Sequence, residues 1–241
     1  RPRRRMSRGT EAKSAWAFVL PLVAVELTLV AAPMALGAFY SLYRVDYFEL
    51  TQFRGLGNYW TVLTSPMVRQ ALGATFVFSL ASLAFTVVFG MALAMRLEAD
   101  TRVNVWLRAI VLIPYIISML VGSLLLRWIY ATDSGIPGML LGPFGLGDTS
   151  ILADPTLAMA ALVSNAIWRD SAFAMIVLLA GLKAIPAQLY AAARVDGAGA
   201  WMRFTRITLP LMPVPLLIAV VRLLIHFVNV LTFALILTGG G

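Results

Sequence analysis

The chain has 241 residues, of which 61% are hydrophobic and 12% charged, with no cysteine and one histidine. Soluble domains are usually about 45–50% apolar and about 25% charged. The composition therefore excludes an ordinary soluble enzyme, a disordered chain, a disulfide scaffold and a thiolate or multi-histidine metal site. The net charge of +8 does not indicate nucleic-acid binding, because the basic residues are spread between long apolar runs and form no basic, soluble face.

Five apolar runs follow one another along the chain, each long enough to cross a hydrocarbon core of about 30 Å as a helix. We predict membrane spans at residues 15–43, 70–95, 109–130, 156–182 and 214–238. These runs do not alternate apolar and polar residues as barrel strands do. The predicted fold class is therefore all-α, a polytopic transmembrane helical bundle that forms a single domain over residues 1–241.

The distribution of lysine and arginine predicts the orientation of this bundle. The basic tail 1–14, the loop after the second span and the loop 183–213 carry most of the arginines, whereas residues 131–155 carry neither lysine nor arginine. Because basic loops stay in the cytoplasm, we expect a cytoplasmic N-terminus and a cytoplasmic loop at 183–213. The first run is longer than the core of a signal peptide, so we expect it to remain as a helix.

Sequence motifs of catalysis are missing from the chain. It contains no GxxxxGK[ST] nucleotide-binding loop, no HExxH metal motif and no GxSxG nucleophile motif. We therefore predict no catalytic residue, no metal ligand and no cofactor bound by this chain.

The loop 185–213 predicts a helical hairpin. Residues 187–195 and 198–209 form two short helical segments around an Asp196-Gly197 turn, and Pro210 ends the second. The apolar residues of the second segment fall on one face: Trp201, Phe204 and Ile207. Such a hairpin either lies at the lipid interface or docks a cytosolic partner, and the pattern alone favours neither.

This loop resembles the EAA loop of bacterial ABC importer permeases, whose pattern is EAA, two residues, DGA, five residues, F, two residues, I, one residue and LP. The matching residues are Asp196, Gly197, Ala198, Phe204, Ile207, Leu209 and Pro210. FRGLGNY at 53–59 and LTGGG at 237–241 are similar to the carbohydrate-uptake branch, the type of the larger maltose permease subunit. Ala191 stands where the pattern has glutamate, which weakens the expectation of an ionic contact there.

The resemblance implies a permease subunit of an ATP-driven, binding-protein-dependent importer of a sugar or sugar-like solute in the bacterial inner membrane. The implied partners are a second permease, two ATPase subunits that hold ATP and Mg, an extracytoplasmic binding protein and membrane lipid, but no nucleic acid. The residues expected to couple to the ATPase are Ala191, Ala192, Asp196, Gly197, Ala198, Trp201, Phe204, Ile207 and Pro210. The family has six spans, so we expect a last span beyond residue 241.

Two alternatives to sugar import stay open at this point. The same architecture could import a glycerol phosphate ester or a polyol. Alternatively, the chain could belong to a different functional class, as a membrane scaffold that transports no solute.

Polar and aromatic residues inside the predicted spans are candidates for a solute path. They are Asn165, Trp168, Asp170, His226, Phe227 and Asn229. Polar groups at this depth either line a water-filled path or bond neighbouring helices, and for Arg222 and Glu26 a structural role is favoured. Arg169 and Asp170 are adjacent, so their side chains point about 100° apart and should pair with other helices.

Overall fold

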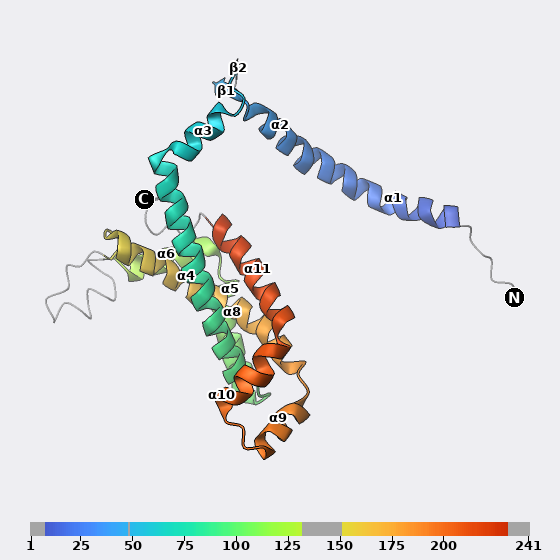
Figure 1. Ribbon diagram of the computed structural model, residues 1–241, viewed down its shortest axis with the longest axis vertical. Coiled ribbons are helices and arrows are strands. Elements are labelled where there is room, and N and C mark those ends of the chain that lie inside the picture. Colours follow the sequence, from blue (N-terminus) through green and yellow to red (C-terminus); the bar gives the residue numbers. More distant parts are fainter. Residues whose placement is uncertain (1–7, 48, 132–150, 231–241) are drawn as a thin grey trace. The chain divides into compact units, whose positions relative to one another are not determined.

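The computed structural model describes residues 8–47, 49–131 and 151–230 (Figure 1). The chain divides into two compact units, Arg1–Leu72 and Gly73–Gly241. Each unit is described by itself below.

The first unit begins with a long apolar helix. It consists of α1 (Arg8–Glu26), a π-helical turn (Leu27–Ala31) and α2 (Ala32–Tyr40). The stretch Trp16–Tyr40 has a mean hydropathy of 2.1 and buries none of its residues within the chain. Exposed leucine, valine and phenylalanine side chains suit a helix surrounded by lipid. The helix begins at Arg8, so part of the predicted tail is helical, and it ends at Tyr40 rather than at residue 43.

A small β-hairpin follows α2, which the all-α prediction did not include. Strand β1 (Tyr43–Asp46) pairs antiparallel with β2 (Glu49–Phe53), and helix α3 (Gly57–Thr64) comes next. Strands of four and five residues are too short to stand out from a polar loop by periodicity alone.

Residues of the FRGLGNY motif (53–59) bind the β-hairpin to the end of α2 through hydrogen bonds. The Asn58 side-chain amide donates to the carbonyl oxygens of Ser41 and Tyr43, both at 2.9 Å, and the Tyr59 hydroxyl lies 2.6 Å from Ser41 Oγ. Gly55 has a φ of 54°, a left-handed conformation that glycine adopts without strain. The motif therefore has a structural role in this turn.

In its described residues, the second unit is a bundle of five longer helices with a helical hairpin inserted before the last of them. The longer helices are α4 (Pro66–Arg96, which begins in the first unit), α5 (Arg102–Ile116), α6 (Met119–Ile129), α8 (Pro155–Lys183) and α11 (Pro213–Asn229). The inserted elements are α9 (Ala187–Val195), α10 (Ala200–Arg203), a π-helical turn (Phe204–Thr208) and a 3-10 turn (Leu209–Leu211).

Helix α8 is the centre of this bundle and packs against α5 and α11. It begins at a local cap, because Asp154 Oδ1 accepts from the backbone N–H groups of Thr156 and Leu157, each at 2.9 Å. Its buried residues Leu178 and Leu182 join Met212, Leu223 and Phe227 in the core. Helix α4 comes close to α8 at Gly90, where a Cβ atom would collide with Ala174.

Three helical stretches of the described residues are long and apolar enough to cross a membrane, and five are if each sharply bent helix pair counts as one. Helices α4 and α8 correspond to the runs predicted at 70–95 and 156–182. The predicted span 109–130 corresponds to most of α5 together with α6, which are separated by a break with a bend of 94°. Ile117 is extended there, shortly after Pro114, which cannot donate a helical hydrogen bond.

The predicted second segment of the hairpin also differs in detail. It runs from Ala200 to Leu211 and changes from α to π to 3-10 geometry, so Pro210 lies inside its last turn. For the predicted span 214–238, helix α11 covers the part up to Asn229, and residues 231–238 and the LTGGG motif lie outside the described residues.

Candidate functional site

A cluster of charged side chains lies where α8 meets α11. The Asp170 carboxylate is fully buried, and its Oδ1 lies 3.9 Å from Nη1 of both Arg169 and Arg222. Its Oδ2 lies 3.5 Å from Nε2 of His226. Asp170 thus meets Arg222 and His226 of α11, as predicted, whereas Arg169 lies as close to Asp170, its neighbour in α8, which the prediction did not include.

None of these contacts is a hydrogen bond by geometry. Both carboxylate oxygens of Asp170 lack a hydrogen-bond partner among the described residues, as do Arg169 Nε, Arg222 Nη1 and His226 Nε2. Buried polar groups in proteins are nearly always hydrogen-bonded. This cluster therefore holds donors that the described chain itself leaves unsatisfied.

Two aromatic rings form one wall of the cluster. Tyr115 of α5 and Phe173 of α8 are stacked, with ring centroids 6.1 Å apart. The Arg222 guanidinium lies 4.3 Å from the Phe173 centroid, and its Nη2 donates to the Tyr115 hydroxyl at 3.2 Å. The Arg169 guanidinium lies 5.7 Å from the Tyr115 centroid. Cation–π contacts hold both guanidinium groups against the rings.

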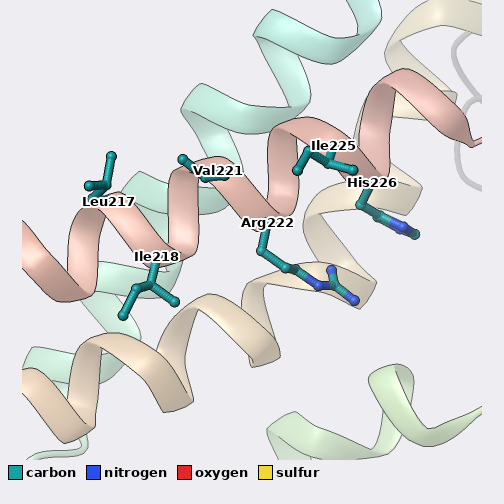
Figure 2. A pocket seen from close by; sticks show the side chains of 6 residues that line it. All are labelled: Leu217, Ile218, Val221, Arg222, Ile225 and His226. Carbon is teal, nitrogen blue, oxygen red and sulfur yellow. The ribbon is translucent and has the colours of Figure 1, made fainter. Parts of the chain in front are cut away.

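An open hollow of about 630 Å³ lies beside this cluster. Figure 2 shows that the side chains of Arg222 and His226 project from one side of α11, while those of Leu217 and Val221 project from another. Ile218 and Ile225 complete the lining, so its wall is mostly apolar apart from the two basic side chains.

The other predicted path residues are dispersed. Asn165 is fully buried and its amide lies 3.4 Å from Ser123 Oγ of α6, whereas Trp168 is 39% exposed. Phe227 lies in the core, edge-on to Phe78 at 5.9 Å. Asn229 is exposed and donates to the carbonyl oxygen of Ile225 in its own helix at 2.7 Å. The structure thus brings Asp170 and His226 together, with the Phe227 ring 5.5 Å from that of His226. Within the described part of the chain, Asn165, Trp168 and Asn229 form no hydrogen bond, ion pair or ring contact with either residue.

The hairpin of α9 and α10 turns at Gly197. Its φ of 75° is left-handed, and a Cβ atom at this position would meet no other atom within 4 Å. The backbone N–H of Gly197 donates to the carbonyl of Arg194, and that of Ala198 donates to Ala193. Arg203 Nη1 donates to the carbonyl oxygen of Ala198 at 2.8 Å and closes the turn from the other side.

The predicted apolar face of the hairpin is divided between surface and core. Trp201 is 75% exposed, and its ring lies 5.6 Å from that of Phe204. Phe204 and Ile207 are half-buried against the core, and Tyr190 is tied to Thr208 by a 2.9 Å hydroxyl contact. Ala191, Ala192, Asp196 and Pro210 are exposed, and Ala198 is half-buried. The hairpin therefore exposes an aromatic ring at Trp201 together with the charged side chains of Arg194, Asp196 and Arg206.

Two contacts fix the start of this hairpin to the bundle. A Cβ atom at Gly181 would lie 2.5 Å from Pro215 and 2.8 Å from Met212, so α8 and α11 touch there. Lys183 donates to both carboxylate oxygens of Asp100 at 2.5 and 2.7 Å. With Arg108, which also donates to Asp100, it lowers the pKa of this carboxyl below its usual value.

Sequence reasoning missed Tyr115, Phe173 and Asp100. Phe173 follows Asp170 by three residues, which places both on one helix face and could have suggested the aromatic wall. Tyr115 and Asp100 come from other helices or loops, and no local pattern marks their contacts. Among the described residues there is no group of three or more histidine, cysteine, aspartate or glutamate side chains that could hold a metal.

Comparisons with known proteins agree on one family. The profile of the family described as "Binding-protein-dependent transport system inner membrane component" matches residues 86–241. The chain is 34% identical over 233 residues to the trehalose/maltose transport system permease protein MalF of Thermococcus litoralis, covering 96% of this chain and 79% of the relative. It is 31% identical over 237 residues to the trehalose transport system permease protein SugA of Mycobacterium tuberculosis, covering 97% and 76%.

A solved structure is similar over nearly the whole chain. It is a chain of a bacterial ABC transporter involved in the import of the acidic polysaccharide alginate, with a TM-score of 0.81 and 26% identity. The similarity covers 95% of this chain and 78% of that one. A second structure of an alginate transporter, in complex with a periplasmic protein that holds an alginate pentasaccharide, has a TM-score of 0.79.

Proposed function

The chain belongs to the family of binding-protein-dependent transport system inner membrane components, and we propose that it forms one half of the path of an ATP-driven sugar importer. Its membrane-embedded helices and its sugar-permease relatives support this role as a non-enzymatic transport subunit. The single observation that carries the proposal is the family match over residues 86–241, which includes both the charged cluster and the hairpin.

The hairpin is the proposed contact with a cytosolic ATPase subunit, which would hold ATP and Mg. The predicted coupling residues lie on or beside the turn at Gly197, and the exposed Trp201 ring gives the partner an apolar anchor. Because the hairpin is tied to α8 and α11, a movement of the ATPase would pass directly to the helices that carry the charged cluster. This proposal places the hairpin and the N-terminus in the cytoplasm.

The proposed solute path runs along the polar side chains of α8 and α11. His226 is the predicted path residue that the geometry supports best, since it lines the hollow, and the fully buried Asp170 lies behind it at 3.5 Å. Asn165, Trp168, Phe227 and Asn229 stay predictions. Of these, Phe227 is 1% exposed, so it would reach a solute only after the helices move apart.

The proposed assembly contains a second permease subunit, two ATPase subunits and an extracytoplasmic binding protein. The likeness to a transporter chain solved in complex with a sugar-loaded periplasmic protein supports the last of these partners. The proposed location is the inner membrane.

Reconstitution of the complete importer into proteoliposomes tests the proposal. The probe is the solute that co-purifies with the binding protein, and uptake should require both ATP and that binding protein. Uptake without ATP would contradict it. A purified chain that retains no ATPase subunit would also contradict it and would favour a membrane scaffold. Omission of the binding protein alone is the matched control.

A further inference from the structure

We propose that the cluster of Arg169, Asp170, Arg222 and His226 is a binding site for a negatively charged group on the transported solute. The chemical class is an oxyanion, either the carboxylate of a sugar acid or the phosphate of an ester. This inference rests on the proposed transport function and adds the charge of the solute to it.

The net charge of the cluster is the first argument. Two guanidinium groups face one carboxylate, so the site has an excess of one positive charge even when His226 is neutral. An unbalanced charge at this depth is costly, which is why ionisable residues in membrane helices face a partner or a water-filled path. A neutral sugar would leave this excess in place, whereas an oxyanion would balance it.

The hydrogen-bond inventory is the second argument. Arg169 Nε, Arg222 Nη1 and His226 Nε2 have no acceptor among the described residues, although each belongs to a side chain within 3.9 Å of Asp170. Distances of 3.5–3.9 Å are too long for strong charge-assisted hydrogen bonds. The two Asp170 oxygens lack a hydrogen bond as well, so neither these donors nor the carboxylate beside them is satisfied within the described residues. An oxyanion in the hollow would add acceptors to this cluster.

Exposure decides which charge a solute would meet. The Asp170 side chain is completely buried, whereas those of Arg169, His226 and Arg222 are 13%, 19% and 38% exposed. Arg222 and His226 also line the open hollow on α11 (Figure 2). The negative charge is thus covered by the three basic groups, and the surface offered to the hollow is positive.

The aromatic wall is the fourth argument, because it fixes the position of the Arg222 guanidinium. Tyr115 and Phe173 hold the Arg222 guanidinium in a defined place, with one of its nitrogens bonded to the Tyr115 hydroxyl. A guanidinium group held by such contacts loses less freedom when it binds a carboxylate or phosphate. Apolar side chains on the same hollow suit the C–H faces of a sugar ring.

Direct binding to the purified importer tests this assignment without its binding protein. The probes are digalacturonate, its neutral counterpart galactobiose, and glycerol 3-phosphate, each titrated at low and at moderate salt. We expect the anionic probes to bind about tenfold more tightly than galactobiose, as charge-assisted hydrogen bonds would provide. If digalacturonate binds more tightly than glycerol 3-phosphate, the site is assigned to sugar acids. If glycerol 3-phosphate binds more tightly, the site is assigned to phosphate esters.

Variants of Arg222 separate binding from structure. Arg222→Gln should remove the preference for the anionic probes, Arg222→Lys should restore part of it, and the matched control Arg69→Gln should leave it unchanged. Equal binding of digalacturonate and galactobiose by the parent complex would overturn the inference. So would an Arg222→Gln protein that loses thermal stability and keeps the preference, because the cluster would then only join α8 to α11.

The failure of this inference is distinguishable from that of the proposed function. If the parent importer drives ATP-dependent uptake of a neutral sugar and Arg222→Gln does so at the same rate, the anion site is wrong and the transport role stands. If the parent importer moves no solute at all, the transport role fails, whatever the binding measurements give.

Discussion

The ammonium group of Lys183 lies 2.5 and 2.7 Å from the two carboxylate oxygens of Asp100, although the two residues are 83 positions apart. Arg108 joins them at 3.0 Å from Asp100 Oδ1 and also donates to the carbonyl oxygens of Leu97, Glu98 and Ala99. The last turn of α8 is thereby fixed to the loop between α4 and α5, three residues before the hairpin begins.

Asp100→Asn should loosen the base of the hairpin. We expect faster amide hydrogen exchange at residues 97–101 and 184–189 and weaker stimulation of ATP hydrolysis by loaded binding protein. The thermal unfolding temperature should stay close to the parent value, because exposed ion pairs contribute little to stability. Glu98→Gln is the matched control, since it removes the same charge two residues away. Unchanged exchange at both segments would show that Asp100 does not anchor the hairpin.

The same ion pair predicts a pH dependence. Lys183 and Arg108 lower the pKa of Asp100 in the folded protein. Their contacts with Asp100 therefore favour folding at any pH above the ordinary pKa of an aspartate, about 4. This contribution is lost as the pH falls through the lowered pKa. Hydrogen exchange at residues 184–189 should therefore differ between the parent and Asp100→Asn by a constant factor from pH 5 to 8. A factor that shrinks within this range would contradict the prediction.

Gly197→Val should uncouple transport while the protein still inserts. A β-branched residue at a φ of 75° costs about 1–2 kcal/mol, and the turn would shift to relieve this strain. ATP-driven uptake in proteoliposomes should fall to background. Gly199→Ala is the control, because Gly199 has a φ of −66° and open space around its Cβ position. Normal uptake by Gly197→Val would show that the hairpin does not act as a rigid lever.

Asn229→Leu should impair uptake or alter its specificity, with the ATPase subunits still bound. The change removes an exposed amide near the end of α11, and one lost hydrogen bond to a solute raises the KM by about tenfold. Val228→Leu, at the adjacent and 54% exposed position, should leave uptake kinetics as they are. Parent kinetics in Asn229→Leu would remove Asn229 from the solute path.

Gly90→Ala should destabilise the bundle. The added Cβ would collide with Ala174 and lie 3.2 Å from both Met175 N and Ser171 O, so α4 and α8 would have to separate. Overpacking of this kind costs about 1–3 kcal/mol, which a lower unfolding temperature in detergent would report. Gly73→Ala on the same helix meets no atom within 4 Å and should stabilise it slightly. Equal unfolding temperatures for the two variants would exclude close α4–α8 packing in solution.

The sequence by itself determined the class of the molecule and the form of the hairpin. Helical periodicity, apolar length and turn chemistry are local properties, so the membrane-helix bundle, helices α4 and α8 and the left-handed turn at Gly197 could be predicted from neighbouring residues. The match of Asp196, Gly197 and Ala198 to a known loop identified the family for the same reason.

The tertiary structure alone decided which distant side chains meet. Asp170 was expected to pair with another helix, but the packing of α11 on α8 selected Arg222 and His226 and left their donors unsatisfied. The packing of α5 on α8 brought Tyr115 to the same cluster, and the bundle brought Asp100 to Lys183. A helix pattern fixes the face on which a residue lies, whereas its partner depends on the register and crossing of two helices, which no local pattern contains.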